Sequence, residues 1–349
     1  MPTVSWDGDA VVLIDQRLLP GRTVFLRCRT VARLADAIAS LAVRGAPAIG
    51  IAAGYGAVLA ALEAPRGRGF RTAVSAGLDL LARTRPTAVN LFHAIGVQRG
   101  ILESCRSRDQ AVEALLSSAR RMHEEDLEAS RKIGRLGAGL LPEGARVLTH
   151  CNAGGLATGG LGTALAVLFE AHSRGRLEKV FADETRPLLQ GSRLTAWELS
   201  RAGIPVTVLP DSAAASLLRS GAVDAVVTGA DRIARNGDVA NKIGTYPLAL
   251  AAAEAGVPFY IAAPVSTFDY GCPDGDSIPI EMRSGDELRK LGGRILAPSR
   301  AEVHNPAFDV TPARLVSAVI LETGVAFPPL PRSLSKLTAQ SVGATICRL

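Results

Sequence analysis

Reactive side chains recur directly after short apolar runs in the second half of the chain. Cys151 follows one such run and Asp231 follows another. If the runs are parallel strands, their carboxyl ends share one edge of a sheet, and open α/β sheets bind ligands outside that edge. A polar residue after a strand also commonly caps the next helix, but several together favour a site. The segments that follow the runs are 150–152, 183–186, 211–212, 228–231 and 263–266.

Cys151 is the candidate thiol at this edge. It stands between the end of a predicted strand and a glycine-rich segment. Helix-dipole and backbone N–H donors in such a place lower the pKa of a thiol and make it reactive. The alternative is a small buried cysteine that only packs. The residues alone leave both interpretations open.

Asp231 is the candidate acid. It ends the apolar segment AVVTGAD, and a partly buried carboxyl group there would have a raised pKa suited to proton transfer. The alternatives are an ion pair with the adjacent Arg232 and a helix cap.

Three basic residues are candidates for binding a phosphate group. Lys242 is one of only five lysines and follows Asn241, while Arg44 (in RGAP) and Arg85 (in RPTAVN) lie at predicted helix boundaries. We expect the two arginines to reach a phosphate across a cleft between two domains. The alternative for all three is an ordinary exposed side chain.

The glycine-rich segment NAGGLATGGLGT, residues 152–163, also favours anion binding, because glycines let backbone N–H groups approach an anion near a helix N-terminus. It is not a P-loop, since Gly160 and Leu161 stand where Lys and Ser/Thr are required. It is a poor dinucleotide-binding motif because the closing small residue is missing. Asp183 follows at about the distance of a ribose contact, so a nicotinamide dehydrogenase stays a weak alternative.

Strand-like runs alternate with helical segments after Pro142, which predicts βαβ units and a parallel, Rossmann-like sheet. The predicted strands are Arg146–His150, Lys179–Ala182, Pro205–Leu209, Ala225–Thr228, Pro258–Ala262 and, more weakly, Arg294–Leu296. The predicted helices are Gly162–His172, Ser192–Arg201, Ala213–Ser220 and Tyr246–Gly256.

The first half of the chain predicts a smaller, mostly helical domain with a short β-hairpin. Val11–Ile14 and Thr23–Leu26 flank a Leu-Pro-Gly turn, and apolar residues then recur at helical spacing from Thr30. We therefore expect an α/β protein with an N-terminal domain, 1–137, and a Rossmann-like C-terminal domain, 138–349. The tail Phe327–Leu349 holds three prolines close together and is expected to be irregular or packed on a partner.

Composition excludes several classes of protein. The 349 residues are 48% hydrophobic, which excludes overall disorder, but only 4% aromatic, so the cores must be aliphatic. The formal net charge of +6 comes from scattered arginines, which argues against nucleic acid and favours a small phosphorylated anion.

Cysteine usage and targeting patterns bear on the expected bonding of the cysteines and on the cellular location. The five cysteines form no CxxC pair, which argues against a disulfide framework and a thiolate zinc site. The N-terminus lacks the pattern of a signal peptide. The nearly uncharged stretches 41–62 and 153–169 do not resemble membrane helices. We expect a soluble, cytoplasmic protein.

Six motifs together resemble the S-methyl-5-thioribose-1-phosphate isomerase family, which shares a superfamily with the regulatory α, β and δ subunits of eukaryotic initiation factor 2B. The resemblance covers about residues 3–329 and excludes the last twenty. The motifs are RGAPAIG (44–50), RPTAVNL (85–91), THCNAG (149–154), ADETRPLLQGSRLTAWEL (182–199), TGADRIARNGDVANKIGTYPLAL (228–250) and NPAFDVTP (305–312).

The resemblance implies a homodimeric isomerase of methionine salvage that converts methylthioribose 1-phosphate to methylthioribulose 1-phosphate without cofactor or metal. By motif, Cys151 matches the catalytic cysteine and Asp231 the catalytic acid. The residues that match the family's substrate contacts are Arg44, Gly45, Ala46, Arg85, Gln190, Asn241 and Lys242.

The implied reaction suits these residues. The phosphate blocks the anomeric oxygen, so an acid must assist ring opening before a hydrogen moves from C2 to C1. Asp231 would handle protons on the ring and C2 oxygens, and Cys151 would act as a base or a polar stabiliser. Proton and hydride transfer both stay open.

Three segments depart from the family pattern. The loop reads CNAGGLATGGLGTAL where the family is closer to CNAGALATAGYGTAL, the segment 211–218 lacks an amide and a Met, and Met282 stands where an acid is common. These changes could reshape the wall around C5 of the sugar. The same chemistry on 5-deoxyribose 1-phosphate or ribose 1,5-bisphosphate is therefore an alternative. A non-enzymatic regulatory subunit is a further one, which the presence of both Cys151 and Asp231 disfavours.

Overall fold

The computed structural model describes residues 3–85 and 88–346, which form two compact units. Among these residues, the first unit contains those up to Ser130 together with Ala153–Gly162. The second unit contains Arg131–Asn152 and the residues from Thr163 onward. The predicted domain boundary at residue 137 lies near the end of helix α5 (Arg108–Ala138).

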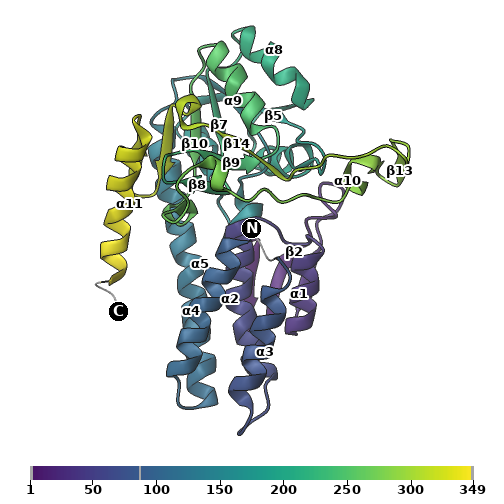
Figure 1. Cartoon of the computed structure of the whole chain (residues 1–349), viewed down its shortest axis with the longest axis vertical. Coiled ribbons are helices and arrows are strands. Elements are labelled where there is room, and N and C mark those ends of the chain that lie inside the picture. The colour runs from purple at the N-terminus through teal and green to yellow at the C-terminus, as the bar shows by residue number, and fades with distance from the viewer. Residues whose placement is uncertain (1–2, 86–87, 347–349) are drawn as a thin grey trace. The chain divides into compact units, whose positions relative to one another are not determined.

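The first unit combines a small antiparallel sheet with a group of helices (Figure 1). The predicted hairpin is present, and a further strand precedes it, because β1 pairs with β2 and β2 with β3. The strands are β1 (Val4–Asp7), β2 (Ala10–Ile14) and β3 (Phe25–Cys28). The helices are α1 (Val31–Ala39), α2 (Ala46–Glu63), α3 (Phe70–Ala82), α4 (Val89–Ser104) and the part of α5 up to Ser130, with the 3₁₀ turn η1 at Gly155–Ala157.

Helix α2 is the central helix of this unit. It packs against α1, α3 and α4, and a Cβ on Gly56 would lie 2.7 Å from a methyl carbon of Leu81 on α3. Among the described residues it is the one helix long and apolar enough to cross a membrane, but 78% of that window is buried inside the protein. Burial on nearly all sides explains a helix that is apolar all round.

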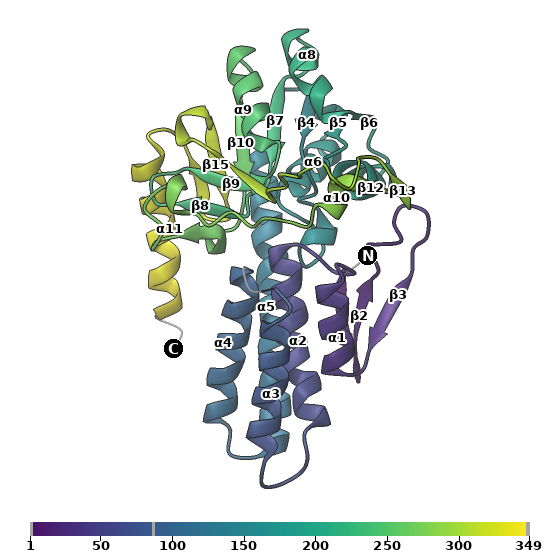
Figure 2. The ribbon, with the colours of Figure 1, turned by 45° about the vertical axis from the view of Figure 1, so that its right-hand side comes forward.

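The second unit is built on a seven-stranded sheet with the order β16-β15-β10-β7-β4-β5-β6 (Figure 2). Every pairing in it is parallel except that of β15 with β16. The strands are β4 (Ala145–Thr149), β5 (Leu177–Asp183), β6 (Val206–Leu209), β7 (Ala225–Thr228), β10 (Phe259–Ala262), β15 (Ala318–Leu321) and β16 (Gly324–Ala326).

The parallel strands alternate with helices as the sequence predicts. The helices are α6 (Ala164–Ser173), α7 (Ala196–Arg201), α8 (Ala214–Arg219) and α9 (Thr245–Glu254). From one edge, the six parallel strands come third, second, first, fourth, fifth and sixth in the chain, which is the order of a Rossmann sheet. Strands β7 and β15 are buried at every position, because helices cover both faces of such a sheet. The expected Rossmann-like fold is confirmed.

The predicted strands need two corrections. Arg294–Leu296 does not join the main sheet, since β13 (Arg294–Ile295) pairs only with β12 (Lys290–Leu291) in an exposed antiparallel hairpin. The sheet instead gains β15 and β16, which the sequence analysis missed. The run AVIL of β15 carries the same apolar signal as the other buried strands.

A second sheet, with the order β11-β8-β9-β14, was not predicted. Its strands are β8 (Arg232–Ala234), β9 (Val239–Lys242), β11 (Phe268–Asp269) and β14 (Phe308–Thr311), and it carries Asn241 and Lys242. The helical four-residue element α10 (Asp286–Arg289) precedes β12.

The prediction of an irregular tail is wrong over most of its length. Residues Leu330–Ile346 form helix α11, and Leu330 and Leu334 belong to the core of the second unit. The prolines precede the helix or lie in its first turn, where the missing N–H breaks no helical hydrogen bond. The last three residues of the predicted tail, 347–349, lie outside the described residues.

Candidate active site

The two candidate catalytic residues follow neighbouring strands of the main sheet. Cys151 lies just after β4, and Asp231 lies just after β7. These strands pair with each other and are the first and fourth in the chain. The strand order therefore reverses between them, and ligands of doubly wound sheets bind at the carboxyl ends on either side of that reversal.

The backbone at Cys151 adopts an unusual, tightly held conformation. Its φ is +63°, a left-handed value that few residues other than glycine adopt. The Cys151 N–H donates to Thr185 Oγ1 at 2.8 Å. Its carbonyl accepts from Thr195 Oγ1 at 2.6 Å. Two buried threonines thus fix the backbone on both sides of the residue.

Thr185 is held by the segments on either side of it. Its own φ is also +63°, which is a genuine outlier for a β-branched residue. The carboxylate of Asp211 accepts the N–H groups of Thr185 and Arg186, each at 2.7 Å. Asp211 is the first residue of the 3₁₀ turn η3 (Asp211–Ala213). The neighbouring strand ends therefore fix the Cys151 turn jointly.

The segment that supplies Thr195 is a π-helical turn, η2 (Gly191–Thr195). It lies so close to β5 that a Cβ on Gly191 would be 1.6 Å from the Asp183 carbonyl oxygen. Only glycine fits there. Such turns are frequent at functional sites because they redirect side chains within a helix.

Gln190, which precedes this turn, is a buried residue that matches a substrate contact of the family. It is 4% exposed, and its Oε1 has no hydrogen-bond partner among the described residues. A buried amide oxygen without a partner costs free energy. This atom is therefore available to a ligand.

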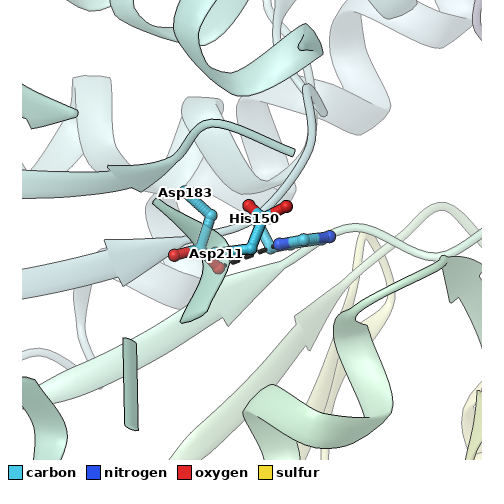
Figure 3. Close-up of side chains that lie close together, drawn as sticks. All are labelled: His150, Asp183 and Asp211. Carbon is cyan, nitrogen blue, oxygen red and sulfur yellow. Dashed lines mark hydrogen bonds and ion pairs between the residues drawn. The ribbon is translucent and has the colours of Figure 1, made fainter. Parts of the chain in front are cut away.

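His150, the residue before Cys151, forms a buried pair with Asp183, and Figure 3 shows both side chains. His150 Nδ1 lies 2.9 Å from Asp183 Oδ2, and His150 Nε2 lies 2.9 Å from the Ile243 carbonyl oxygen. Burial disfavours the imidazolium, but the hydrogen bond and charge of Asp183 outweigh it, so the pKa of His150 is raised. Burial also raises the pKa of Asp183, against the opposing effect of His150. Both directions favour keeping a proton in the pair.

Asp211 completes a cluster with this pair, in which one potential metal ligand from each residue lies within 4.8 Å of the others. Both oxygens of Asp211 already accept backbone N–H groups, and both ring nitrogens of His150 are hydrogen-bonded. The cluster is therefore organised as a hydrogen-bond network that supports the strand ends.

Asp231 differs from its predicted environment. The sequence suggested a partly buried carboxyl group, but the residue is exposed. Its N–H donates to the Ala240 carbonyl at 2.9 Å, which ties it to β9. The alternative partner Arg232 is instead bonded to Asp269 at 3.0 Å.

Asn241 and Lys242 lie at the end of β9, within the second sheet. Asn241 is buried, and its Nδ2 donates to Thr245 Oγ1 at 3.0 Å. Lys242 Nζ donates to the Ala307 carbonyl at 3.0 Å and lies 4.6 Å from the centre of the Phe308 ring. Lys242 is thus held in place rather than extended into solvent.

The other predicted substrate contacts belong to the first unit. Arg44 and Arg85 are half-buried, and Ala46 is the first residue of α2. Gly45 precedes it with a φ of +94°, and a Cβ there would lie 2.3 Å from the Ala157 carbonyl oxygen. Glycine is therefore required at this position by the fold of the first unit itself.

Three N–H groups of the glycine-rich segment are not presented as predicted. The Gly159 N–H donates to Asp126 Oδ2 at 2.7 Å, and the Gly162 N–H donates to Thr158 Oγ1 at 2.8 Å. The Gly160 N–H also reaches Thr158 Oγ1, at 3.3 Å. These three donors already have partners within the protein, so the prediction that they cradle an anion needs correction.

The supporting residues Thr185, Thr195 and Asp211 were not identified as site residues from sequence. Thr185 and Asp211 do belong to the polar segments that follow predicted strands, which was the available signal. Thr195 had none, because it lies inside a predicted helix.

Comparison with known proteins places this arrangement in a family. The profile of the Initiation factor 2 subunit family matches residues 42–328, and the chain belongs to that family. The methylthioribose-1-phosphate isomerase of Geotalea daltonii is 52% identical over 342 residues, which cover 97% of this chain and 99% of the relative. That of Pelotomaculum thermopropionicum is 50% identical, over 96% of this chain and 94% of the relative. The resemblance that the motifs indicated is confirmed.

Two solved structures carry different names. The 5-methylthioribose 1-phosphate isomerase from Pyrococcus horikoshii OT3 has a TM-score of 0.92 and 44% identity, over 96% of this chain and 95% of that one. The translation initiation factor eIF-2B, subunit delta, from A. fulgidus has a TM-score of 0.90 and 45% identity, over 97% of this chain and 99% of that one.

Proposed function

We propose that this chain is an isomerase that converts S-methyl-5-thioribose 1-phosphate to S-methyl-5-thioribulose 1-phosphate in methionine salvage. The observation that carries the proposal is the 50–52% identity, over nearly the whole of both chains, to proteins named methylthioribose-1-phosphate isomerase. The position of Cys151 and Asp231 after adjacent strands at the reversal of strand order supports it.

The proposed reaction is an aldose–ketose conversion, an intramolecular oxidation and reduction. The exposed Asp231 gives its proton to the ring oxygen as the ring opens. The resulting carboxylate then accepts the proton of the C2 hydroxyl group as C2 becomes the ketone carbon. Cys151 acts at C1 and C2 from its fixed turn, as a base or a polar stabiliser. The residues that bind the sugar phosphate are those that match the family's substrate contacts: Arg44, Gly45, Ala46, Arg85, Gln190, Asn241 and Lys242. The chain uses no metal or cofactor, works as a homodimer and is cytoplasmic.

The test is a side-by-side measurement of kcat/KM for three sugar phosphates by ³¹P NMR or a product assay. The substrates are methylthioribose 1-phosphate, 5-deoxyribose 1-phosphate and ribose 1,5-bisphosphate. We expect the methylthio compound to have the highest kcat/KM. A higher value for either other sugar would keep the isomerase chemistry and change the substrate.

A regulatory subunit is the second candidate, because one solved structure at 45% identity is named as an initiation factor subunit. That function predicts no turnover of any of the three sugars. Binding measured by calorimetry without isomerisation would favour it, and turnover would exclude it as the sole function.

A further inference from the structure

His150 joins three segments of the second unit. It directly precedes Cys151, and its ring contacts Asp183 at the end of β5 and the Ile243 carbonyl after β9. A Cβ on Gly244 would lie 2.8 Å from His150 Cε1, and Gly244 has a φ of +102°. The ring therefore lies directly against this backbone. It connects the Cys151 turn to the segment that follows Asn241 and Lys242.

The contacts of His150 determine where its hydrogens must be. A carbonyl oxygen only accepts, so Nε2 carries a hydrogen and donates it to Ile243. An unprotonated Nδ1 and a carboxylate are both acceptors. Their separation of 2.9 Å therefore requires a second hydrogen between them.

The charged groups around the pair favour retention of that hydrogen. Asp211 from η3 acts electrostatically on both His150 and Asp183, and Glu184 after β5 acts on Asp183. Asp309 from β14 interacts with His150 across the helix N-terminus that it caps, where it accepts the N–H groups of Gly244 and Tyr246. Each of these groups is a carboxyl group.

We propose that His150 and Asp183 form one positioning unit, which keeps a shared proton at neutral pH and thereby holds the Cys151 turn against the segment after Lys242. Without that proton, two acceptors would face each other at 2.9 Å in a buried site, and the contact would break. The kinetic consequence rests on the proposed function. The shared proton and the geometry of the turn do not.

The first test measures the proton. In the unfolded chain, histidine has a pKa of about 6.5 and aspartate one of about 3.9. Above about pH 6.5 the folded pair thus holds one proton more than the unfolded chain. The stabilisation of the folded protein by this proton is complete below about pH 6.5. Above that pH, the folding equilibrium constant falls by up to about tenfold for each pH unit.

Asp183→Asn isolates this effect, because the amide can donate to an unprotonated Nδ1 and needs no extra proton. Urea unfolding of wild type and variant is measured from pH 6 to 9. The ratio of their unfolding equilibrium constants should change by about tenfold per pH unit above pH 7. Asp224→Asn is the matched control. Asp224 pairs with Arg146 at the amino ends of β4 and β7, away from Cys151, and this pairing lowers its pKa. The ratio of unfolding constants between wild type and Asp224→Asn should therefore not vary with pH in this range. A pH-independent difference for Asp183→Asn would overturn the shared proton.

A second measurement uses the wild-type protein, in case Asp183→Asn does not fold. In NMR of the ¹⁵N-histidine-labelled protein at pH 8, we expect His150 to keep a hydrogen at Nε2 and a second hydrogen in the bond between Nδ1 and Asp183. Absence of that bridging hydrogen would contradict the proposal.

The third test measures positioning. In Asp183→Ala, which removes the partner of His150 Nδ1, we expect kcat to fall at least tenfold while KM changes less than threefold, because no substrate contact is removed. Asp183→Asn, which keeps a partner for Nδ1, should restore kcat to within threefold of wild type. Iodoacetamide should alkylate Cys151 severalfold faster as its turn loosens, and Cys272, which is buried elsewhere in the same unit, should react at the wild-type rate. Unchanged kcat and an unchanged alkylation rate would overturn the positioning role. If the chain turned over no sugar, the unfolding and alkylation results would still decide this proposal separately.

Discussion

Cys151 occupies a backbone conformation that costs free energy, about 1–3 kcal/mol for a residue other than glycine. Its φ of +63° is maintained by Thr185 and Thr195, which bond to its N–H and carbonyl. A cysteine that only packs would not need such support. The geometry therefore favours the chemical interpretation of Cys151 over the packing one.

We expect Cys151→Ala and Asp231→Asn each to reduce kcat at least about 100-fold, the usual contribution of a group that moves protons in the reaction. Neither change should alter the thermal unfolding midpoint by more than a few degrees. The controls are Cys272→Ala and Asp224→Asn in the same unit, which should keep wild-type kcat. Residual activity within tenfold of wild type in either variant would remove that residue from the mechanism.

Gln190→Leu separates binding from stability. The substitution removes a buried oxygen that has no partner among the described residues. We therefore expect the free energy of unfolding to rise by about 1 kcal/mol. It should also raise KM at least tenfold, because a substrate contact is lost. Denaturant titration and steady-state kinetics measure the two effects.

Gln98→Leu is the matched control. Gln98 is also buried and its Oε1 also has no partner among the described residues, but its Nε2 donates to the carbonyls of Gly54 and Leu115 within the first unit. Its loss should lower stability and leave KM unchanged. If Gln190→Leu behaved in the same way, Gln190 would be a structural residue.

At the scale of elements, the π-helical turn η2 connects the end of β5 to Cys151. Gly191 lets the turn lie against the Asp183 carbonyl, and Thr195 at its end reaches the Cys151 carbonyl. The sequence predicted a helix from Ser192, which is close. It did not predict the π-helical form, because that depends on contact with a strand.

We therefore expect Gly191→Ala to destabilise the protein by about 3 kcal/mol, since the added carbon overlaps backbone that cannot move away. It should also lower kcat, because Thr195 shifts. Gly100→Ala in helix α4 is the control, as a Cβ there meets nothing within 4 Å. That change should raise stability by up to about 1 kcal/mol. Equal stabilities of the two variants in urea unfolding would show that η2 tolerates a side chain.

The strands of the main sheet were predictable because each is a short apolar run followed by a polar segment. The second sheet was not, since β8 and β9 are short strands joined by a turn, and β14 comes from 66 residues further along the chain, where Phe308 pairs with Lys242. Proline in the tail was also misleading, because its effect depends on its place in a helix.

At the scale of the whole molecule, the formal net charge of +6 should assist the approach of a sugar phosphate. We expect kcat/KM to fall as KCl is raised from about 0.05 to 0.5 M, because salt screens long-range attraction. Since bound substrate is held by close contacts, kcat should stay constant. If kcat fell together with kcat/KM over the same KCl range, salt would instead be perturbing the fold.

Consecutive residues were enough to determine the α/β class, most strands and helices, and the family. These properties depend on local periodicity and on motifs, which a linear sequence contains in full. The tertiary structure decided which side chains meet. His150 bonds to Asp183, 33 residues away, and to Ile243, 93 residues away, because strand pairing brings those segments together. It also decided that Asp231 is exposed and that three N–H groups of the glycine-rich segment, those of Gly159, Gly160 and Gly162, already have partners, since burial and hydrogen-bond partners depend on how the chain packs.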